Sequence, residues 1–176
     1  LGRDFDSALI RHVAPLDELS LQEGLEILAD AGIVHHQGRP PESKYVFKHA
    51  LVQQTAYESL VKGERQRHHR RTAEVLAKRF VETAELEPEL LAHHHSEAGD
   101  TREAVAYWEK AGQRATQRSG LVEVIDHYTR ALEALRTLPE GQGRDKKELQ
   151  LLLAVGSPLM SVHGYATSEV ETTYAR

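Results

Sequence analysis

The sequence contains no cysteine among its 176 residues, which excludes both a disulfide framework and a thiolate metal site. It also lacks any apolar run that approaches the length needed to cross a bilayer, and no signal-peptide pattern opens it. Apolar residues make up 40% and charged residues 28% of the chain, a balance that favours packed domains over disorder. We therefore expect a cytoplasmic protein with no membrane association.

The sequence has no phosphate-binding loop. Such a loop needs Gly-x4-Gly-Lys-Ser/Thr, so that backbone amides and one lysine can surround phosphate groups, and no such string occurs here. Eleven histidines are present, but no two are spaced four apart as helical metal ligands would be. His93, His94 and His95 are successive on an expected helix and point about 100° apart, so they cannot converge on one ion. We expect no metal site and no catalytic residue.

Charge is distributed unevenly along the chain. Residues 1–83 carry 12 Lys and Arg against 12 Asp and Glu, whereas residues 84–176 carry 10 against 15, which accounts for the net charge of −5. Neither part has the basic excess that is typical of a dedicated nucleic-acid-binding domain. This distribution argues against nucleic acid as a partner.

The first 83 residues show a pattern of helices around a β-hairpin. Phe5–Val13 predicts a short helix, and Ser20 and Glu23 form a capping box that opens a second helix, which ends at Gly32. Two β-favouring runs follow, separated by a Pro/Gly loop, and then two helices. Their expected ranges are 33–36 and 45–47 for the strands, and 49–61 and 64–81 for the helices. A hairpin in this position predicts a winged-helix-like domain over residues 1–83.

Residues 84–176 predict a tetratricopeptide-like helical domain. The acidic segment Glu82–Pro88 marks the expected boundary, and tight breaks after it force neighbouring helices to run antiparallel. The expected helices are 88–98, 101–118, 121–138 and 146–155, with another beginning near Ser168. Two repeat registers fit: one places Trp108, Gly112 and Tyr128 at the large and small packing positions, and another places Trp108 in the second half of a repeat. The two registers are offset by about 20 residues where a tetratricopeptide repeat has about 34, so they cannot both be strict repeats. The fold class is therefore mainly α, with one small β-hairpin followed by antiparallel helical hairpins.

The two ends of the sequence suggest a piece of a longer protein. Residue 1 is Leu, the only methionine is Met160, and the Ser168–Glu171 capping box would open a helix just before the last residue. We expect the repeat domain to be truncated at its C-terminus.

Several strings along the chain resemble one bacterial family. They are Tyr45–Gln53, Ala56–Leu60, Pro88–His94 and Ala106–Gly112. The family comprises signal-transduction (STAND/AAA-type) ATPases fused to class III adenylate/guanylate cyclase domains or to LuxR-type transcription-regulator domains. The resemblance implies that this chain is the C-terminal arm, behind an ATPase domain of the same polypeptide. It also implies that ATP or ADP binds elsewhere in the parent, which is an ATPase and in one branch a cyclase, since this chain lacks the metal-binding aspartate pair of those cyclases.

The resemblance singles out His49 as a candidate nucleotide contact. In related signalling ATPases, a winged-helix histidine at a strand-to-helix junction contacts the β-phosphate of the nucleotide. His49 follows the second expected strand and opens a helix, where free amides and the helix dipole favour an anion. The family motif is matched only at His49 and Leu51, because its aspartate is replaced by Ala50. Two structural interpretations remain open: His49 caps its helix, or it packs beneath the wing.

Two functions follow from this reading. The first is a non-catalytic regulatory arm that couples nucleotide state to output, with a protein partner or signal received on the helical repeats. The alternative is the DNA-binding winged-helix part of an ATP-dependent transcriptional regulator, suggested by the arginines of the 64–81 helix. Predicted i,i+4 pairs of Glu74 with Arg70 and with Lys78 instead favour a solvated face there. Tyr107, Trp108 and Tyr128 are predicted to be interhelical core and not a ligand groove.

Overall fold

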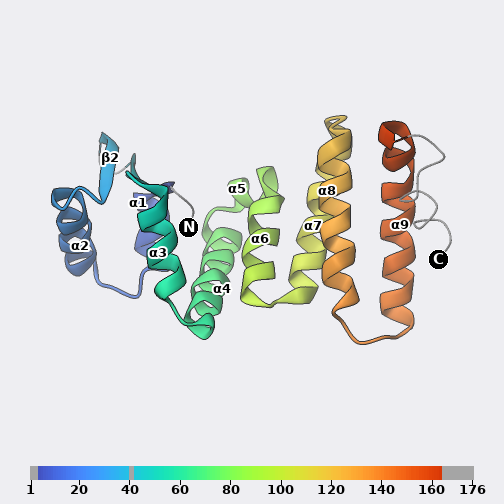
Figure 1. Cartoon of the computed structure of the whole chain (residues 1–176), viewed down its shortest axis with the longest axis horizontal. Helices are drawn as coiled ribbons and strands as arrows, with labels where there is room; N and C mark the ends of the chain where they lie inside the picture. Colours follow the sequence, from blue (N-terminus) through green and yellow to red (C-terminus); the bar gives the residue numbers. More distant parts are fainter. Residues whose placement is uncertain (1–3, 40–41, 164–176) are drawn as a thin grey trace. The chain divides into compact units, whose positions relative to one another are not determined.

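The computed structural model describes residues 4–39 and 42–163, and the chain divides into two compact units, residues 1–80 and 81–176 (Figure 1). The sequence predicts this division after residue 83, three residues later than the structure has it. The fold is mainly α with a small antiparallel sheet and a series of helical hairpins, as the sequence predicted.

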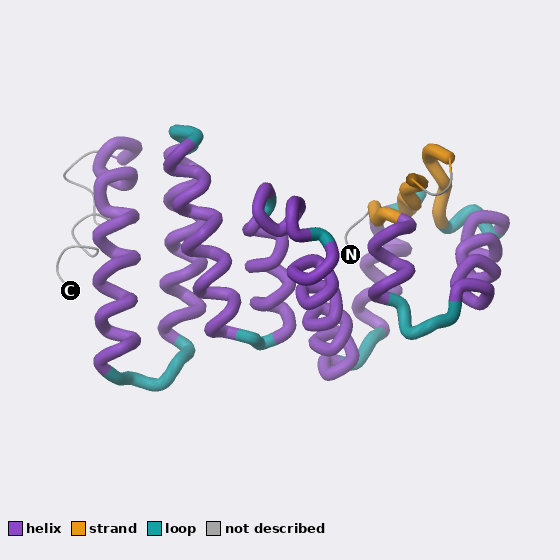
Figure 2. Tube along the Cα trace, turned by 180° about the vertical axis from the view of Figure 1, so that it is seen from behind, coloured by secondary structure: helices purple, strands orange, loops and turns teal. Residues whose placement is uncertain are grey.

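The first unit contains a three-stranded sheet, one strand more than the predicted hairpin. Strands β2 (Val34–Arg39) and β3 (Glu42–Phe47) form the hairpin, and β1 (Asp4–Asp6) pairs with the other edge of β3 to give the order β1-β3-β2 (Figure 2). The prediction of a helix from Phe5 onward was therefore wrong at its start. Phe5 pairs with Tyr45 in the sheet, and their rings stack at a centroid distance of 5.7 Å. This aromatic cross-strand contact stabilises a strand that is too short to show a periodic pattern.

Four helices complete the first unit. They are α1 (Ser7–Val13), α2 (Glu18–Asp30), α3 (Ala50–Ser59) and α4 (Lys62–Arg79). The predicted capping box at Ser20 was wrong. The N-cap is Asp17, whose carboxylate accepts bonds of 3.0 Å from the Ser20 amide and 2.7 Å from its hydroxyl. These bonds lower the pKa of Asp17 below its usual 3.8. The helix ends at Asp30, and the predicted left-handed residue just beyond it is Gly32, with a φ of 70°.

Two groups of side chains hold the first unit together. Leu21 and Leu25 of α2 pack with Val34 and Tyr45 of the sheet. On α4 one face is buried and carries His69, Ala73 and Leu76. Arg71, also on α4, donates to the carbonyl oxygens of His12 and Ala14 at 3.3 Å. This guanidinium satisfies carbonyls that the end of α1 leaves without helical partners.

The second unit is a series of antiparallel helices that lie side by side (Figure 1). They are α5 (Val81–Leu86), α6 (Pro88–Ala98), α7 (Thr101–Gln117), α8 (Leu121–Arg136) and α9 (Gln142–His163). Helix α5 occupies the segment that the sequence analysis treated as a boundary. Helix α9 extends past both ends of the predicted 146–155 range and includes Pro158. The helix predicted near Ser168 lies outside the described residues.

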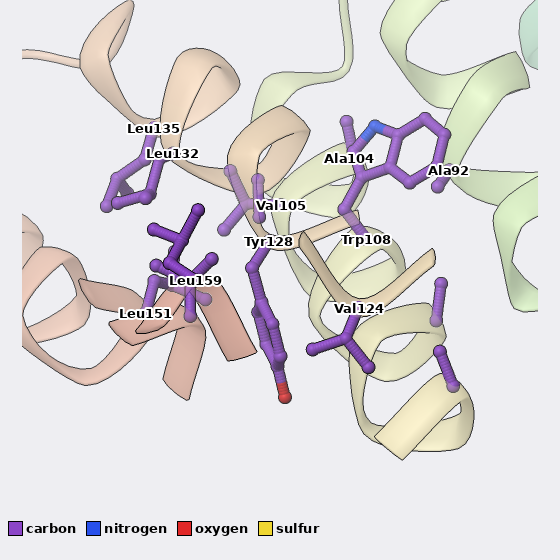
Figure 3. Packing of buried hydrophobic residues seen from close by; sticks show 14 residues of the cluster. Ala92, Ala104, Val105, Trp108, Val124, Tyr128, Leu132, Leu135, Leu151 and Leu159 are labelled. Carbon is purple, nitrogen blue, oxygen red and sulfur yellow. The ribbon is translucent and has the colours of Figure 1, made fainter. Parts of the chain in front are cut away.

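One buried cluster runs through α6 to α9 (Figure 3). Trp108 lies beside Ala92 and Ala104, and Tyr128 lies between Val124 and Leu159 in this view. The backbone of Gly112 in α7 packs closely against the ring of Tyr128 in α8, because a Cβ at Gly112 would stand 2.8 Å from Cζ of the ring. This contact is the large-on-small packing of the first predicted register. Helix α7 also packs against α6, so it takes part in two hairpins.

Candidate functional site

His49 lies at the junction between β3 and α3, as the sequence predicted. It is the N-cap residue of α3, with extended backbone (φ −127°, ψ 122°), and its carbonyl oxygen accepts from the Val52 amide at 3.1 Å. Its imidazole makes no capping hydrogen bond and is exposed. His49 therefore does occupy the cap position of α3, but through its backbone, and the interpretation that it packs beneath the wing is wrong because the ring is exposed. The ring neither caps the helix nor packs beneath the wing.

The helix that His49 opens is almost entirely exposed. None of the ten residues of α3 is buried, although Leu51 and Val52 are apolar and are 76% and 39% exposed. A shallow hollow runs along this face. It is lined by Leu51, Val52, Thr55, Ala56 and Ser59. Large apolar side chains gathered on one exposed helix face are typical of a surface that contacts another protein or domain.

The opposite side of α3 attaches it to α4 through Tyr57. The Tyr57 hydroxyl lies 3.2 Å from Nε2 of the buried His69, and the two rings meet edge to face. The guanidinium of Arg65 lies 5.4 Å from the centre of the Tyr57 ring. A single tyrosine thus supplies the main polar attachment of this helix, which leaves the Leu51 face open.

Part of the arginine-rich surface of α4 is engaged within the first unit. Arg71 is bound to the end of α1, Arg67 lies 3.5 Å from Glu64, and Lys78 lies 3.7 Å from Glu74. The Glu74–Lys78 pair was predicted from the sequence. These neighbours neutralise or occupy several of the cations that a DNA backbone would need.

The clustered histidines do not form a metal centre in the part of the chain that the structure describes. No group of three or more His, Cys, Asp or Glu side chains there could hold an ion. His94 and His95 are buried on α6, where the His95 ring stacks on Tyr107 at a centroid distance of 5.4 Å, and His36 packs on Tyr45. His36 and His95 thus contact aromatic rings, and the ring of His94 lies 5.5 Å from that of His93.

Trp108 and Tyr128 belong to the buried core of the second unit, and Tyr107 packs against that core, as predicted. Trp108 is 6% exposed and donates from Nε1 to the Ser96 hydroxyl at 3.0 Å, while its ring stacks on His127 and faces the Arg130 guanidinium. Tyr128 is 5% exposed, and its burial together with the charge of Glu109 raises the pKa of its phenol. These contacts place both rings in the packed space between the helices.

Sequence reasoning missed the exposed face of α3, although a signal was present. Leu51, Val52 and Ala56 recur at the spacing of one helix face, which from the sequence alone predicts burial within the domain. Only the position of α3 in the structure shows that this face has no neighbour among residues 4–39 and 42–80.

Comparison with known proteins gives a distant relative. No family model matches the chain, and no solved structure matches it. The chain is similar to an uncharacterized protein of Rhizobium meliloti (strain 1021), with 26% identity over 174 residues. This match covers 98% of the chain but 17% of the Rhizobium protein, so the chain spans about a sixth of that relative's length. Within the residues described here, none of the helices combines the length and the apolar character of a membrane span.

Proposed function

We propose that this chain is a non-catalytic regulatory and protein-interaction arm of a multidomain signalling ATPase of the adenylate cyclase type. The observation that supports this proposal is the exposure of α3. This helix begins after His49, has an apolar face along its length, and buries none of its residues in the first unit. An isolated helix of ten residues is marginal in water, so a helix of this kind gains stability from a further neighbour.

The resemblance of Tyr45–Gln53 to signalling ATPases suggests which neighbour this is. In such a protein the strand-to-helix junction faces the nucleotide, so the exposed imidazole of His49 and the first amides of α3 would lie near the phosphates of ADP. The side chains of Leu51 and Val52 would pack on the upstream ATPase domain. The length of the Rhizobium relative leaves ample room for such domains beside a region of this size.

The second unit suits the reception of a protein signal. Stacked antiparallel helices expose extended surfaces, and the outer side of α9 carries Leu149 and Leu153, which are 58% and 61% exposed. In the proposed function the first unit closes on the ATPase domain in its ADP-bound state, and binding to the helical unit releases it. This places the arm in the cytoplasm, with the upstream ATPase domain as its first partner.

The experiment that tests the proposal compares nucleotide retention in the full-length parent. Leu51→Lys places a charge on the exposed face, and Gln54→Lys places the same charge elsewhere on α3, where Gln54 bonds only to Glu58 in the described structure. We expect Leu51→Lys and His49→Ala to release ADP faster, and Gln54→Lys to behave as wild type. Equal ADP release by all three variants and the wild type would reject the proposal. Tight, salt-dependent binding of a DNA duplex by this chain would instead support a transcriptional regulator.

A further inference from the structure

A second cavity of the first unit lies between α1, α3 and α4, on the attached side of α3. Its volume is about 270 Å³, near the lower end of the range for small-ligand pockets. Ile10, Val13 and Leu60 supply apolar walls, and Tyr57, Arg65 and His68 supply polar groups. Apolar walls with a few polar groups are the usual composition of a pocket for a small organic molecule.

The charge of this cavity is uncompensated. No aspartate or glutamate lines it. In the described part of the chain Arg65 has no carboxylate partner, and its guanidinium lies over the ring of Tyr57, 5.4 Å from the ring centre. The cavity between α1, α2 and the sheet differs, because there Arg11 is paired with Glu18 at 3.1 Å. A half-buried guanidinium beside apolar walls favours a ligand that carries both an anion and a hydrocarbon part.

We propose that the cavity between α1, α3 and α4 binds a small apolar monocarboxylate. The carboxylate pairs with Arg65 at the polar side, and the hydrocarbon part contacts Ile10, Val13 and Leu60. Because α3 buries none of its own residues, a ligand that touches both Tyr57 and Leu60 also ties this helix to α1 and α4. Ligand binding therefore slows local opening of α3. This inference stands without the proposed function, since it concerns a pocket that lies within the first unit.

The test is a titration of the full 176-residue chain with hexanoate, followed by methyl NMR of Ile10, Val13 and Leu60. A ligand of this size is expected to bind with a Kd of about 1 mM. Hexanol, which has the same chain without the charge, is expected to bind about tenfold more weakly. Hydrogen exchange of the α3 amides provides a second readout and is expected to slow with hexanoate.

Variants separate the role of Arg65 from general charge. Arg65→Gln is expected to weaken hexanoate binding about tenfold, whereas Arg65→Lys keeps most of the affinity. Arg67→Gln is the matched control, because Arg67 lies on the same helix, pairs with Glu64 and is absent from the cavity wall, and it is expected to leave the Kd unchanged. Equal binding of hexanoate and hexanol, an unchanged Kd in Arg65→Gln, or absence of shifts at the three methyl residues would each overturn the proposal.

Discussion

The contact between Gly112 and Tyr128 makes a sharp prediction about the second unit. In Gly112→Ala the new Cβ would stand 2.8 Å from Cζ and 2.9 Å from both Cε atoms of the Tyr128 ring, closer than real Cβ contacts come. The ring is 5% exposed and is held within the core, so it can give way only by displacing its neighbours. Overpacking of this kind costs about 1–3 kcal/mol.

A gain in helix propensity opposes that cost. Alanine is favoured over glycine by about 1 kcal/mol inside a helix. The net effect of Gly112→Ala is therefore a loss of about 1 kcal/mol in the free energy of unfolding, obtained by subtracting this gain from the middle of the overpacking range. For a unit of this size, such a loss lowers the melting temperature by about 4–8 °C.

Trp108 provides the assay, because it is the only tryptophan of the chain and is buried in the same cluster as Tyr128. Its fluorescence during urea unfolding reports the second unit. Gly24→Ala is the matched control. Gly24 lies inside α2, no atom lies within 4 Å of a Cβ built there, and the substitution is expected to stabilise the first unit by about 0.5–1 kcal/mol, measured by circular dichroism.

A double variant isolates the ring as the cause. In a Tyr128→Leu background the obstructing ring is gone, so Gly112→Ala is expected to become neutral or stabilising. The reasoning is refuted if Gly112→Ala stabilises the second unit as Gly24→Ala stabilises the first, or if the cost of Gly112→Ala is the same with and without the Tyr128 ring.

Three further predictions concern single contacts. Asp17→Ala is expected to lower the melting temperature of the first unit at neutral pH. Because hydrogen bonds lower the pKa of Asp17, this difference should vanish in circular dichroism melts as the pH falls through the folded-state pKa, and a constant difference would contradict the assignment. The raised pKa of Tyr128 means that its contribution to stability is present below the unfolded value of about 10 and is lost as the pH rises through the folded-state pKa. Tyr128→Phe should therefore reduce the loss of unfolding free energy at alkaline pH, measured by urea unfolding with Trp108 fluorescence. The same loss at alkaline pH in Tyr128→Phe and in the wild type would contradict this assignment. Arg71→Gln is expected to cost about 1 kcal/mol in the urea unfolding of the first unit, since its bonds to the end of α1 are lost, whereas Arg67→Gln on the exposed Glu64 pair should cost almost nothing.

The sequence predicted best those elements whose ends are marked by local chemistry. Helix α6 begins at Pro88 and ends before Gly99, the bounds expected from a proline in the first turn and a glycine at the C-terminus. Its Gly99 adopts a φ of 78°, which a residue with a side chain would resist. Signals of this kind act within one turn of the chain and can be read without tertiary structure.

Elements that depend on distant contacts were missed. Strand β1 consists of three residues and exists because Phe5 pairs with Tyr45, forty residues further along the chain. Helix α5 lies in the acidic segment that the sequence presents as a boundary, and α9 continues through Pro158, which locally favours an end. Two residues near the start of α2 could serve as its cap, and Asp17 is used because its carboxylate reaches both the amide and the hydroxyl of Ser20.

The sequence predicted the position of His49 in the chain but not the exposure of its side chain. The sequence placed His49 correctly between a strand and a helix, and the exposure of its ring depends on how α3 lies against the rest of the unit. The cavity beside Arg65 brings together residues from three separate helices, so no local sequence pattern could predict it.

The double role of α7 has a consequence for how the second unit responds to damage. In an ordinary repeat array each hairpin can fray or be deleted with only its own boundary affected, because neighbouring modules share little beyond one interface. Here one helix completes the hairpin before it and begins the hairpin after it, and a single buried cluster extends from Ala92 to Leu159. The second unit should consequently unfold in a single cooperative transition, so that a destabilising substitution at either end lowers the stability of all its helices.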